Sequence, residues 1–335
     1  MTTLRQNINI SQAIAESLKL EMAADDSVLV LGEDVGRQGG VFGSTRGLQR
    51  AFGSERVLDT PIAEAAFTGM AVGLALEGYR PVVEIMFADF IGVCLEQVYN
   101  AIAKNPYMSG GKVTMPIVVK TAGGAIGSAA QHSQSLWGLF AHLPGLRVVA
   151  PSNPHDSKGL MAAAVQSEDP VVFIEHKGLL LKKAAEFSFG TEVPKERYTV
   201  PLGTAAVVHP GSDITVVTLS GSVAHALEAA ATLAAEGMSA EVIDLRSVVP
   251  IDWETIVASL RKTRRLLVVD EDYLGFGLSG ELITGTVERL GLASLDAVAR
   301  HGLDNVPIPA AISLERAVLP TVESIAAAIR RVGAL

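Results

Sequence analysis

The sequence contains a single cysteine, Cys94, among its 335 residues. One cysteine cannot form an internal disulfide or build a thiolate zinc site, which fits a reducing compartment. The first residues show no basic segment followed by an apolar core, so no signal peptide is predicted. No apolar run approaches the roughly 18 residues that span a bilayer. We therefore expect a cytoplasmic protein with no membrane partner.

Aromatic residues are also scarce, at 5%, although hydrophobic residues make up 49% and the mean hydropathy is +0.34. Abundant small aliphatic residues are typical of helices packed closely on parallel sheets. The surplus of apolar residues predicts large cores or a subunit interface. The net charge is −9 and no long basic block occurs, so nucleic acid is not an expected partner.

Short β-branched runs alternate with amphipathic helical segments along the whole chain. This alternation predicts right-handed βαβ units and mostly parallel sheets, an α/β fold. Residues 178–203 interrupt the rhythm, and a second α/β rhythm follows. We predict a first domain over 1–190, a linker over 191–204 and a second domain over 205–335. The expected strands are VLVLG (28–32), PVVEIMF (81–87), PIVVKTAG (116–123), LRVVAPS (146–152), PVVFIEH (170–176), ITVVTLS (214–220), SAEVIDL (239–245) and RLLVVDED (265–272).

Several motifs of nucleotide-binding and hydrolytic enzymes are missing: there is no P-loop, no G-x-S-x-G elbow and no H-E-x-x-H. A literal G-x-G-x-x-G runs from Gly275 to Gly280, after a predicted strand, and could indicate dinucleotide binding. Against that reading, Asp270, Glu271 and Asp272 crowd the strand end where phosphates would lie. We favour a tight glycine turn that packs a helix on its sheet.

Glu64 is the most informative acidic residue. Thr60 and Pro61 are predicted as the N-cap and first residue of a helix, and almost a dozen apolar residues follow Glu64. The simplest interpretation is a solvent-exposed first-turn acid favoured by the helix dipole. The alternative is a carboxyl in an apolar pocket, whose raised pKa would let it exchange a proton near neutral pH.

Two further segments could carry chemistry. His132 lies in the small-residue segment GGAIGSAAQHSQSL, where an imidazole could act as acid, base or donor, or could be an inconsequential surface residue. Met86, Phe87 and Phe90 follow a predicted parallel strand and could line a ligand crevice or simply belong to the core.

These segments, in this order, resemble the β subunit of the thiamine-diphosphate-dependent first component of pyruvate, branched-chain 2-oxo acid and acetoin dehydrogenases. The resemblance extends over essentially the whole chain. The matching strings are LGEDVG (31–36), GGVFGSTRGL (39–48), RVLDTPIAE (56–64), FADF (87–90), YMSGGK (107–112), AAQHSQS (129–135), HLPGLRVVAPSNPHDSKGL (142–160), VIDLRSVVPID (242–252) and GLDNVPIP (302–309).

The resemblance implies a pyrimidine-binding thiamine-diphosphate domain followed by a transketolase-type C-terminal domain. By position, Glu64 would bond to N1′ of the aminopyrimidine, and Met86 and Phe90 would line its pocket. A protonated Glu64 would favour the imino tautomer that removes the C2 proton. His132 would face the substrate and assist transfer of the two-carbon unit to a lipoyl group. A potassium ion is implied near Ser167 and Asp169, held mainly by backbone carbonyls.

The resemblance also implies a partner, because no G-D-G motif for Mg²⁺ and diphosphate occurs in the sequence. The family places that motif on a separate α subunit, in an assembly of two α and two β chains that serves a lipoyl-bearing acyltransferase core. The string EHKGLL (175–180) and FADF look closer to acetoin-type members than to pyruvate-type ones. The alternatives are an NAD-dependent dehydrogenase that uses Gly275–Gly280 and a non-catalytic assembly subunit.

Overall fold

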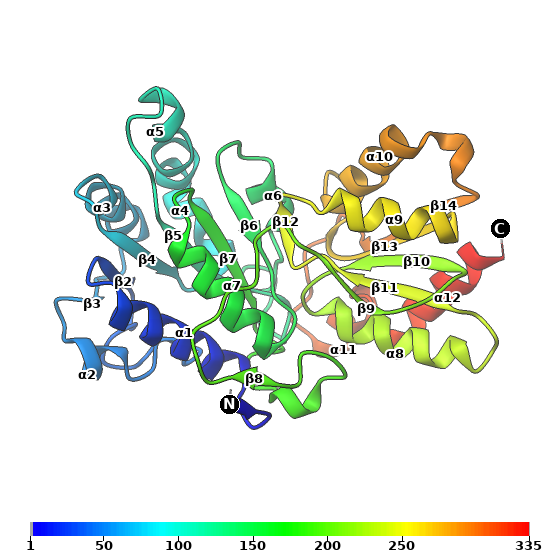
Figure 1. Cartoon of the computed structure of the whole chain (residues 1–335), viewed down its shortest axis with the longest axis horizontal. Helices are drawn as coiled ribbons and strands as arrows, with labels where there is room; N and C mark the ends of the chain where they lie inside the picture. The colour runs from blue at the N-terminus through cyan, green and yellow to red at the C-terminus, as the bar shows by residue number, and fades with distance from the viewer. Residues whose placement is uncertain (1–2, 335) are drawn as a thin grey trace. The chain divides into compact units, whose positions relative to one another are not determined.

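The computed structural model describes residues 3–334 of the chain (Figure 1). The chain forms two compact units. The first comprises Met1–Gly123 and Phe140–Leu202, and the second comprises Gly124–Leu139 and Gly203–Leu335. The second unit therefore takes a sixteen-residue segment from the middle of the first, and this segment contains His132.

The first unit is built on a parallel sheet with the strand order β6-β7-β5-β4-β2-β3. Nearly every residue of β2, β4, β5 and β7 is buried, as expected for parallel strands covered on both faces. Helices α1 and α7 lie side by side against one another (Figure 1). Its strands are β1 (Leu4–Arg5), β2 (Val28–Gly32), β3 (Val57–Asp59), β4 (Arg80–Ile85), β5 (Val118–Gly123), β6 (Arg147–Val149), β7 (Val171–His176) and β8 (Val193–Pro194). Its helices are α1 (Ile10–Ala24), α2 (Leu48–Phe52), α3 (Glu64–Leu76), η1 (Ala88–Phe90), α4 (Ile91–Glu96), η2 (Gln97–Ile102), α5 (Ala103–Met108), α7 (Pro154–Gln166) and η3 (Ala184–Glu186).

The predicted parallel strands of this unit are confirmed, with ends shifted by a few residues. The predicted start of α3 at Thr60 and Pro61 is wrong, because the helix begins at Glu64 with Ala63 as its N-cap. Residues 60–63 are used instead to turn the chain from β3 into the helix. The helical segment 90–105 is interrupted at Cys94, whose φ of −120° is not helical, and by the π-helical turn η2.

The second unit has a five-stranded sheet in the order β14-β13-β10-β11-β9, in which only β9 is antiparallel to its neighbour. The strands predicted at 214–220, 239–245 and 265–272 are confirmed as β10, β11 and β13. Helix α6 (Trp137–Ala141) begins in the segment that this unit takes from the first. The remaining elements are β9 (Ala206–His209), β10 (Ile214–Thr218), α8 (Ser222–Ala234), β11 (Ala240–Asp244), β12 (Ser247–Val249), α9 (Trp253–Thr263), β13 (Arg265–Tyr273), α10 (Leu278–Leu290), η4 (Leu292–Ser294), β14 (Ala297–Leu303), α11 (Ile312–Val318) and α12 (Val322–Gly333).

The predicted linker contains more structure than a surface loop. Strand β8 pairs antiparallel with β1, and the side chains of Val193 and Val200 are buried. Val200 joins the main core of the first unit. The domain boundaries at 190 and 205 stay a prediction.

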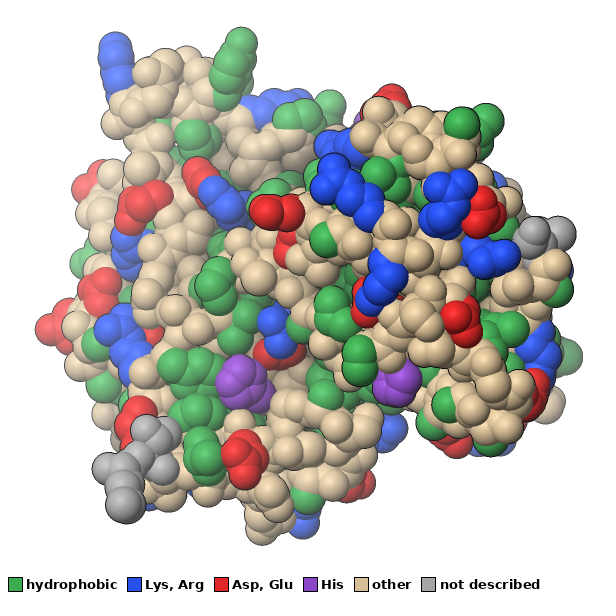
Figure 2. Space-filling model, turned by 45° about the vertical axis from the view of Figure 1, so that its right-hand side comes forward, with side chains coloured by type: hydrophobic (Ala, Val, Ile, Leu, Met, Phe, Trp, Pro, Cys, Tyr) green, Lys and Arg blue, Asp and Glu red, His purple; other side chains and the backbone are tan. Residues whose placement is uncertain are grey.

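The surface carries both signs of charge. Figure 2 shows acidic and basic side chains interspersed over one face of the molecule, without a large field of one sign. Within residues 3–334, every helix is too short or too polar to cross a membrane.

Candidate active site

The carboxyl ends of three neighbouring parallel strands bring the predicted residues of the first unit to one edge of its sheet. Glu33 directly follows β2, Glu64 follows β3 after a short turn, and Met86 directly follows β4. These strands are adjacent, and Gly32 is in register with both Asp59 and Glu84. Ligands of open α/β sheets bind at this edge, outside the carboxyl ends of the strands.

Glu64 is the first residue of α3 and is only 8% exposed, so the solvent-exposed interpretation is not what the structure shows. Burial raises the pKa of Glu33, and the nearby charge of Glu64 raises it further. Burial likewise raises the pKa of Cys94 to about 11, with the charge of Glu64 adding to the effect. The charge of Glu64 therefore acts on both a second carboxyl and the buried thiol of α4.

An aromatic cluster forms where the chain leaves the carboxyl end of β4. The ring of Phe87 meets Phe90 edge-on at 5.3 Å between centroids and meets Phe42 edge-on at 5.7 Å. The Lys177 ammonium lies 5.0 Å from the centroid of the Phe87 ring. Phe90 ends η1, and both it and Met86 are half-buried. These side chains offer apolar ring faces for a planar ligand.

Two buried oxygen atoms at this edge have no hydrogen-bond partner within residues 3–334: Oε1 of Glu33 and Oγ1 of Thr60. Buried polar atoms without partners are rare and commonly mark a ligand or water site. An aminopyrimidine needs a carboxyl for its ring nitrogen, acceptors for its amino group and an apolar surface for its ring. Glu64, the two oxygen atoms and the aromatic cluster match those needs.

His132 lies in the segment that belongs to the second unit. Its Nδ1 is 3.1 Å from the carbonyl of Ser128, and its backbone N–H donates to the carbonyl of Ala129 at 3.3 Å. Ala129 has a φ of +64°, which costs a residue with a Cβ roughly 1 kcal/mol. Such strain clusters at functional sites and persists only where the surroundings impose it. The structure groups Glu64, Met86 and Phe90 in one unit and His132 in the other.

A cavity of about 480 Å³ lies within the second unit and is lined in part by sequence neighbours of His132. Amide and phenol side chains provide the polar part of its lining. Its walls are Ala130, Gln131, Gln134, Tyr273, Asn305, Val306 and Pro307.

The Gly275–Gly280 segment forms a tight turn between β13 and α10, as favoured from the sequence. A Cβ at Gly277 would lie 2.0 Å from the carbonyl oxygen of Tyr273, so only glycine fits there. Asp270 and Asp272 are buried just before this turn. Asp270 accepts a hydrogen bond from the Trp137 indole N–H, and Asp272 accepts one from the Gly138 N–H. Their charges would oppose a pyrophosphate at this place.

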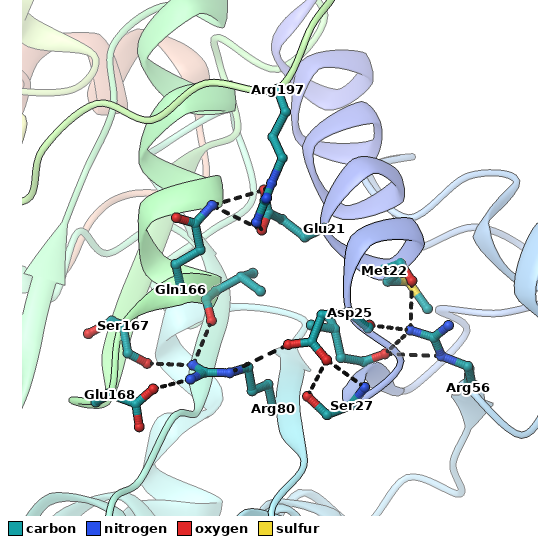
Figure 3. Close-up of polar contacts among 12 residues, drawn as sticks. Glu21, Met22, Asp25, Ser27, Arg56, Arg80, Gln166, Ser167, Glu168 and Arg197 are labelled. Carbon is teal, nitrogen blue, oxygen red and sulfur yellow. Dashed lines mark hydrogen bonds and ion pairs between the residues drawn. The ribbon is translucent and has the colours of Figure 1, made fainter.

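The turn at Ser167 and Asp169, where potassium was predicted, follows α7. The Ser167 carbonyl accepts a hydrogen bond from Arg80 at 3.1 Å, and Arg80 also donates to the Val165 carbonyl at 3.2 Å (Figure 3). The same guanidinium pairs with Glu168 and lies 3.7 Å from Asp25 at the end of α1. The Asp169 carbonyl accepts from Ser167 Oγ at 2.8 Å. Within residues 3–334, no group of three or more His, Cys, Asp or Glu side chains could hold a metal ion.

A buried charge cluster on the central strands was missed from the sequence. The Lys120 ammonium on β5 lies 3.0 Å from carboxylate oxygens of both Glu84 on β4 and Glu175 on β7. All three side chains are at least 96% buried, and Ser44 donates to Glu175 at 3.3 Å. The sequence did contain a hint of this cluster, because each of the three strands carries one Lys or Glu among apolar residues. What the sequence lacked was the strand order that brings the three together.

Comparison with known proteins defines the class of the chain. Residues 6–182 match the model of the transketolase pyrimidine-binding domain, and residues 203–325 match that of the transketolase C-terminal domain. A solved split-gene transketolase, described as an inactive β4 tetramer, superposes with a TM-score of 0.79 at 25% identity and covers 98% of this chain and 99% of its own. The two predicted domain types are therefore confirmed.

Closer relatives narrow this class. The chain is 44% identical to the acetoin:2,6-dichlorophenolindophenol oxidoreductase β subunit of Bacillus subtilis, covering 95% of both chains. It is 42% identical to the subunit of the same name from Cupriavidus necator, covering 98% of both. The pyruvate dehydrogenase E1 β subunit of Bacillus subtilis is also 44% identical, over 85% of this chain and 86% of its own. The chain belongs to the family of β subunits of thiamine-diphosphate-dependent acetoin and 2-oxo acid dehydrogenases.

Proposed function

We propose that this chain supplies the aminopyrimidine half of a thiamine diphosphate site in an acetoin-cleaving or 2-oxo acid-cleaving oxidoreductase. The observation that carries the proposal is the buried carboxyl of Glu64 at the carboxyl edge of the first sheet, beside Glu33 and the aromatic cluster. Bound thiamine diphosphate would supply the nucleophilic carbon that adds to the substrate carbonyl.

Glu64 would hold a proton toward N1′ of the aminopyrimidine. Glu64 is buried at the first position of α3, close enough to Glu33 for the two charges to interact. A carboxyl held there would act as a general acid toward the ring nitrogen. Phe90 and Met86 would pack on the ring and exclude water from the proton-transfer path.

His132 would act later, when the two-carbon unit passes to a lipoyl group. In that step two electrons of the two-carbon unit would break the lipoyl S–S bond, so that one sulfur bonds to the acyl carbon and the other takes up a proton. The bond between the acyl carbon and the cofactor would then break as the hydroxyl on that carbon loses its proton. An imidazole in a strained loop is suited to deliver the proton that the second sulfur takes up. A dye that accepts electrons directly needs no proton on sulfur.

We further propose that an α subunit completes the site and holds Mg²⁺ and the diphosphate, because this sequence has no G-D-G motif. The β-subunit names of the relatives support an α partner. An assembly of two α and two β chains that serves a lipoyl-bearing acyltransferase core is the arrangement we propose. The two relatives whose names include acetoin each align with this chain over at least 95% of both sequences. Acetoin is therefore the substrate we favour.

The test is Glu64→Gln in the purified α–β complex. Loss of the exchangeable proton should lower turnover of acetoin by about 10²- to 10⁴-fold, with an unchanged melting temperature. Glu77→Gln is the matched control, because Glu77 is the exposed C-cap of the same helix. Near wild-type turnover of Glu64→Gln would refute the assignment. A panel of acetoin, pyruvate and branched-chain 2-oxo acids with the same complex decides the substrate.

A potassium ion at the turn after α7 remains part of the proposal. Each carbonyl oxygen has two lone pairs, so the Ser167 and Asp169 carbonyls can accept their present hydrogen bonds and still face a cation. We expect a higher melting temperature in potassium chloride than in sodium chloride at equal ionic strength. Equal melting temperatures would exclude the ion.

A further inference from the structure

The segment that carries His132 is fastened at both ends by carboxylates of the second unit. At its beginning, the Gly127 N–H donates to both carboxylate oxygens of Glu315 on α11, at 3.0 and 2.8 Å. At its end, the Trp137 indole N–H donates to Asp270 at 2.8 Å, and the Gly138 N–H donates to Asp272 at 3.1 Å. Between these points, the Tyr273 hydroxyl lies 3.4 Å from the Gln134 side-chain oxygen.

The carboxylates and the indole of these anchors are buried, whereas Gly127 is exposed and Gly138 is half-buried. Asp270 is fully buried, Trp137 is 1% exposed, and Glu315 is 5% exposed. Hydrogen bonds to charged acceptors in such surroundings are short and strong, and a buried N–H left without its acceptor costs free energy. The anchors therefore fix the backbone on either side of His132.

The strained backbone at Ala129 needs such anchors. An alanine with a φ of +64° relaxes to an ordinary conformation unless its surroundings prevent it. Ala129 lies between the Gly127 anchor and His132, and its carbonyl accepts the N–H of His132 at 3.3 Å. The anchors and the strain together set the direction of the imidazole.

We propose that Asp270, Asp272 and Glu315 are positioning residues for His132, acting through Trp137, Gly138 and Gly127. The inference rests on the proposed function of His132 in transfer to the lipoyl group. Asp270 Oδ1 accepts from both Trp137 and the Asp272 N–H, the latter at 3.0 Å. The acidic residues before the glycine turn thus hold the His132 segment.

The test compares two acceptors in the α–β complex: a lipoylated acyltransferase domain and the dye 2,6-dichlorophenolindophenol. Trp137→Phe removes the indole N–H and keeps an aromatic ring. We expect the lipoyl-linked kcat to fall by about tenfold, because small displacements of a proton donor are costly, while the dye-linked kcat changes less than about twofold. Trp253→Phe is the matched control, since it changes the other tryptophan, which packs on Arg289.

A structural measurement accompanies the kinetics. Backbone amide hydrogen exchange over residues 127–138 should be faster in Trp137→Phe than in Trp253→Phe. Asp270→Asn keeps an oxygen that can accept both N–H groups. Its lipoyl-linked rate should therefore stay within about twofold of the wild-type rate. The double variant His132→Ala/Trp137→Phe should lose no more activity than His132→Ala alone.

Glu315→Ala tests the other anchor without altering the packing of an aromatic ring, and Glu315→Gln is its conservative counterpart. The proposal is overturned if Trp137→Phe and Glu315→Ala match Trp253→Phe in both assays and in exchange. If His132→Ala leaves the lipoyl-linked rate unchanged, the assigned function of His132 fails instead. Faster exchange in the anchor variants would then still identify Asp270, Asp272 and Glu315 as the residues that fix this segment.

Discussion

At the scale of single residues, Asp270 illustrates how one buried carboxyl can hold two N–H groups through a single oxygen. Its Oδ1 accepts two N–H groups, while Oδ2 has no hydrogen-bond partner in the described part of the chain. Burial raises its pKa to about 7, and the charge of Asp272 adds to the increase. Burial also raises the pKa of Asp272 to about 6. A proton on Oδ2 leaves both hydrogen bonds on Oδ1 intact.

This predicts a pH dependence of stability with a definite sign. Because the folded protein binds the proton of Asp270 more tightly than the unfolded chain, whose carboxyl has a pKa near 3.8, the free energy of unfolding should fall as pH rises from about 4 to about 7. The groups that face Asp270 are the carboxyls of Asp272 and Glu271 and the indole of Trp137. Urea midpoints at pH 5 and pH 8 measure the change.

Asp270→Asn is the control for that pH series, since its side chain cannot ionise. The wild type should gain stability over Asp270→Asn on going from pH 8 to pH 5. A constant difference between the two proteins at both pH values would contradict the raised pKa. Asp272 titrates in the same direction and is present in both proteins, so the difference between them reports Asp270 together with its interaction with Asp272.

At the scale of elements, the strands were the most predictable part of the fold. Apolar β-branched runs define β2, β5, β7 and β10 almost to the residue, because parallel strands are buried on both faces and have no polar alternation to misread. Helix starts were less predictable. Thr60 and Pro61 form a good sequence signal for an N-terminus, but the turn out of β3 uses those residues, and α3 begins at Glu64 without a side-chain cap.

The candidate site also has parts that the sequence predicts and parts that it does not. Glu64, Met86, Phe90 and His132 were singled out from local patterns and given roles by the family resemblance. The carboxyl-edge rule explains why Glu64 follows β3 while Met86 and Phe90 follow β4, on either side of β2. Glu33 was not singled out, although it follows β2 at the same edge. The anchors of His132 could not be predicted, since Trp137 and Asp270 are separated by 133 positions in the sequence. No local pattern encodes a pairing at that distance.

The charge cluster across β4, β5 and β7 gives a prediction for the central sheet. Burial alone would lower the pKa of Lys120, but the charges of Glu175 and Glu84 outweigh burial and raise it. Lys120→Met leaves two buried carboxyls facing each other, so it should lower the free energy of unfolding by about 3–5 kcal/mol. Lys112→Met, at an exposed position, is the control. Equal urea midpoints for the two variants would show that the cluster contributes nothing to stability.

At the scale of the whole molecule, the proposed function gives the chain one half of a cofactor site. The aminopyrimidine side can be assembled from Glu64 and the aromatic cluster, whereas the sequence has no motif for the diphosphate. The exposed apolar side chains along α3 to α5 include Leu76, Val93 and Tyr107, which supports a subunit interface for this family member.

This division predicts that cofactor affinity depends on the partner chain. Titration calorimetry of the isolated chain with thiamine diphosphate and Mg²⁺ should give at most weak binding, because the diphosphate lacks its ligands. The α–β complex should bind the same ligands at least about a hundredfold more tightly, equivalent to about 2.7 kcal/mol. Tight binding to the isolated chain would mean that this chain holds the diphosphate itself.

The division of the chain between its two units also has a consequence for synthesis. Residues 124–139 leave the ribosome long before their anchors, since Trp137 and Asp270 are 133 positions apart. At translation rates of about 5–20 residues per second, the His132 segment waits roughly 7–27 s for its partner. The first sheet can form during that interval, but the segment that carries the imidazole cannot take its final shape. The nascent chain can therefore fold the first sheet, where the aminopyrimidine is proposed to bind, before the segment that carries His132 reaches its final conformation.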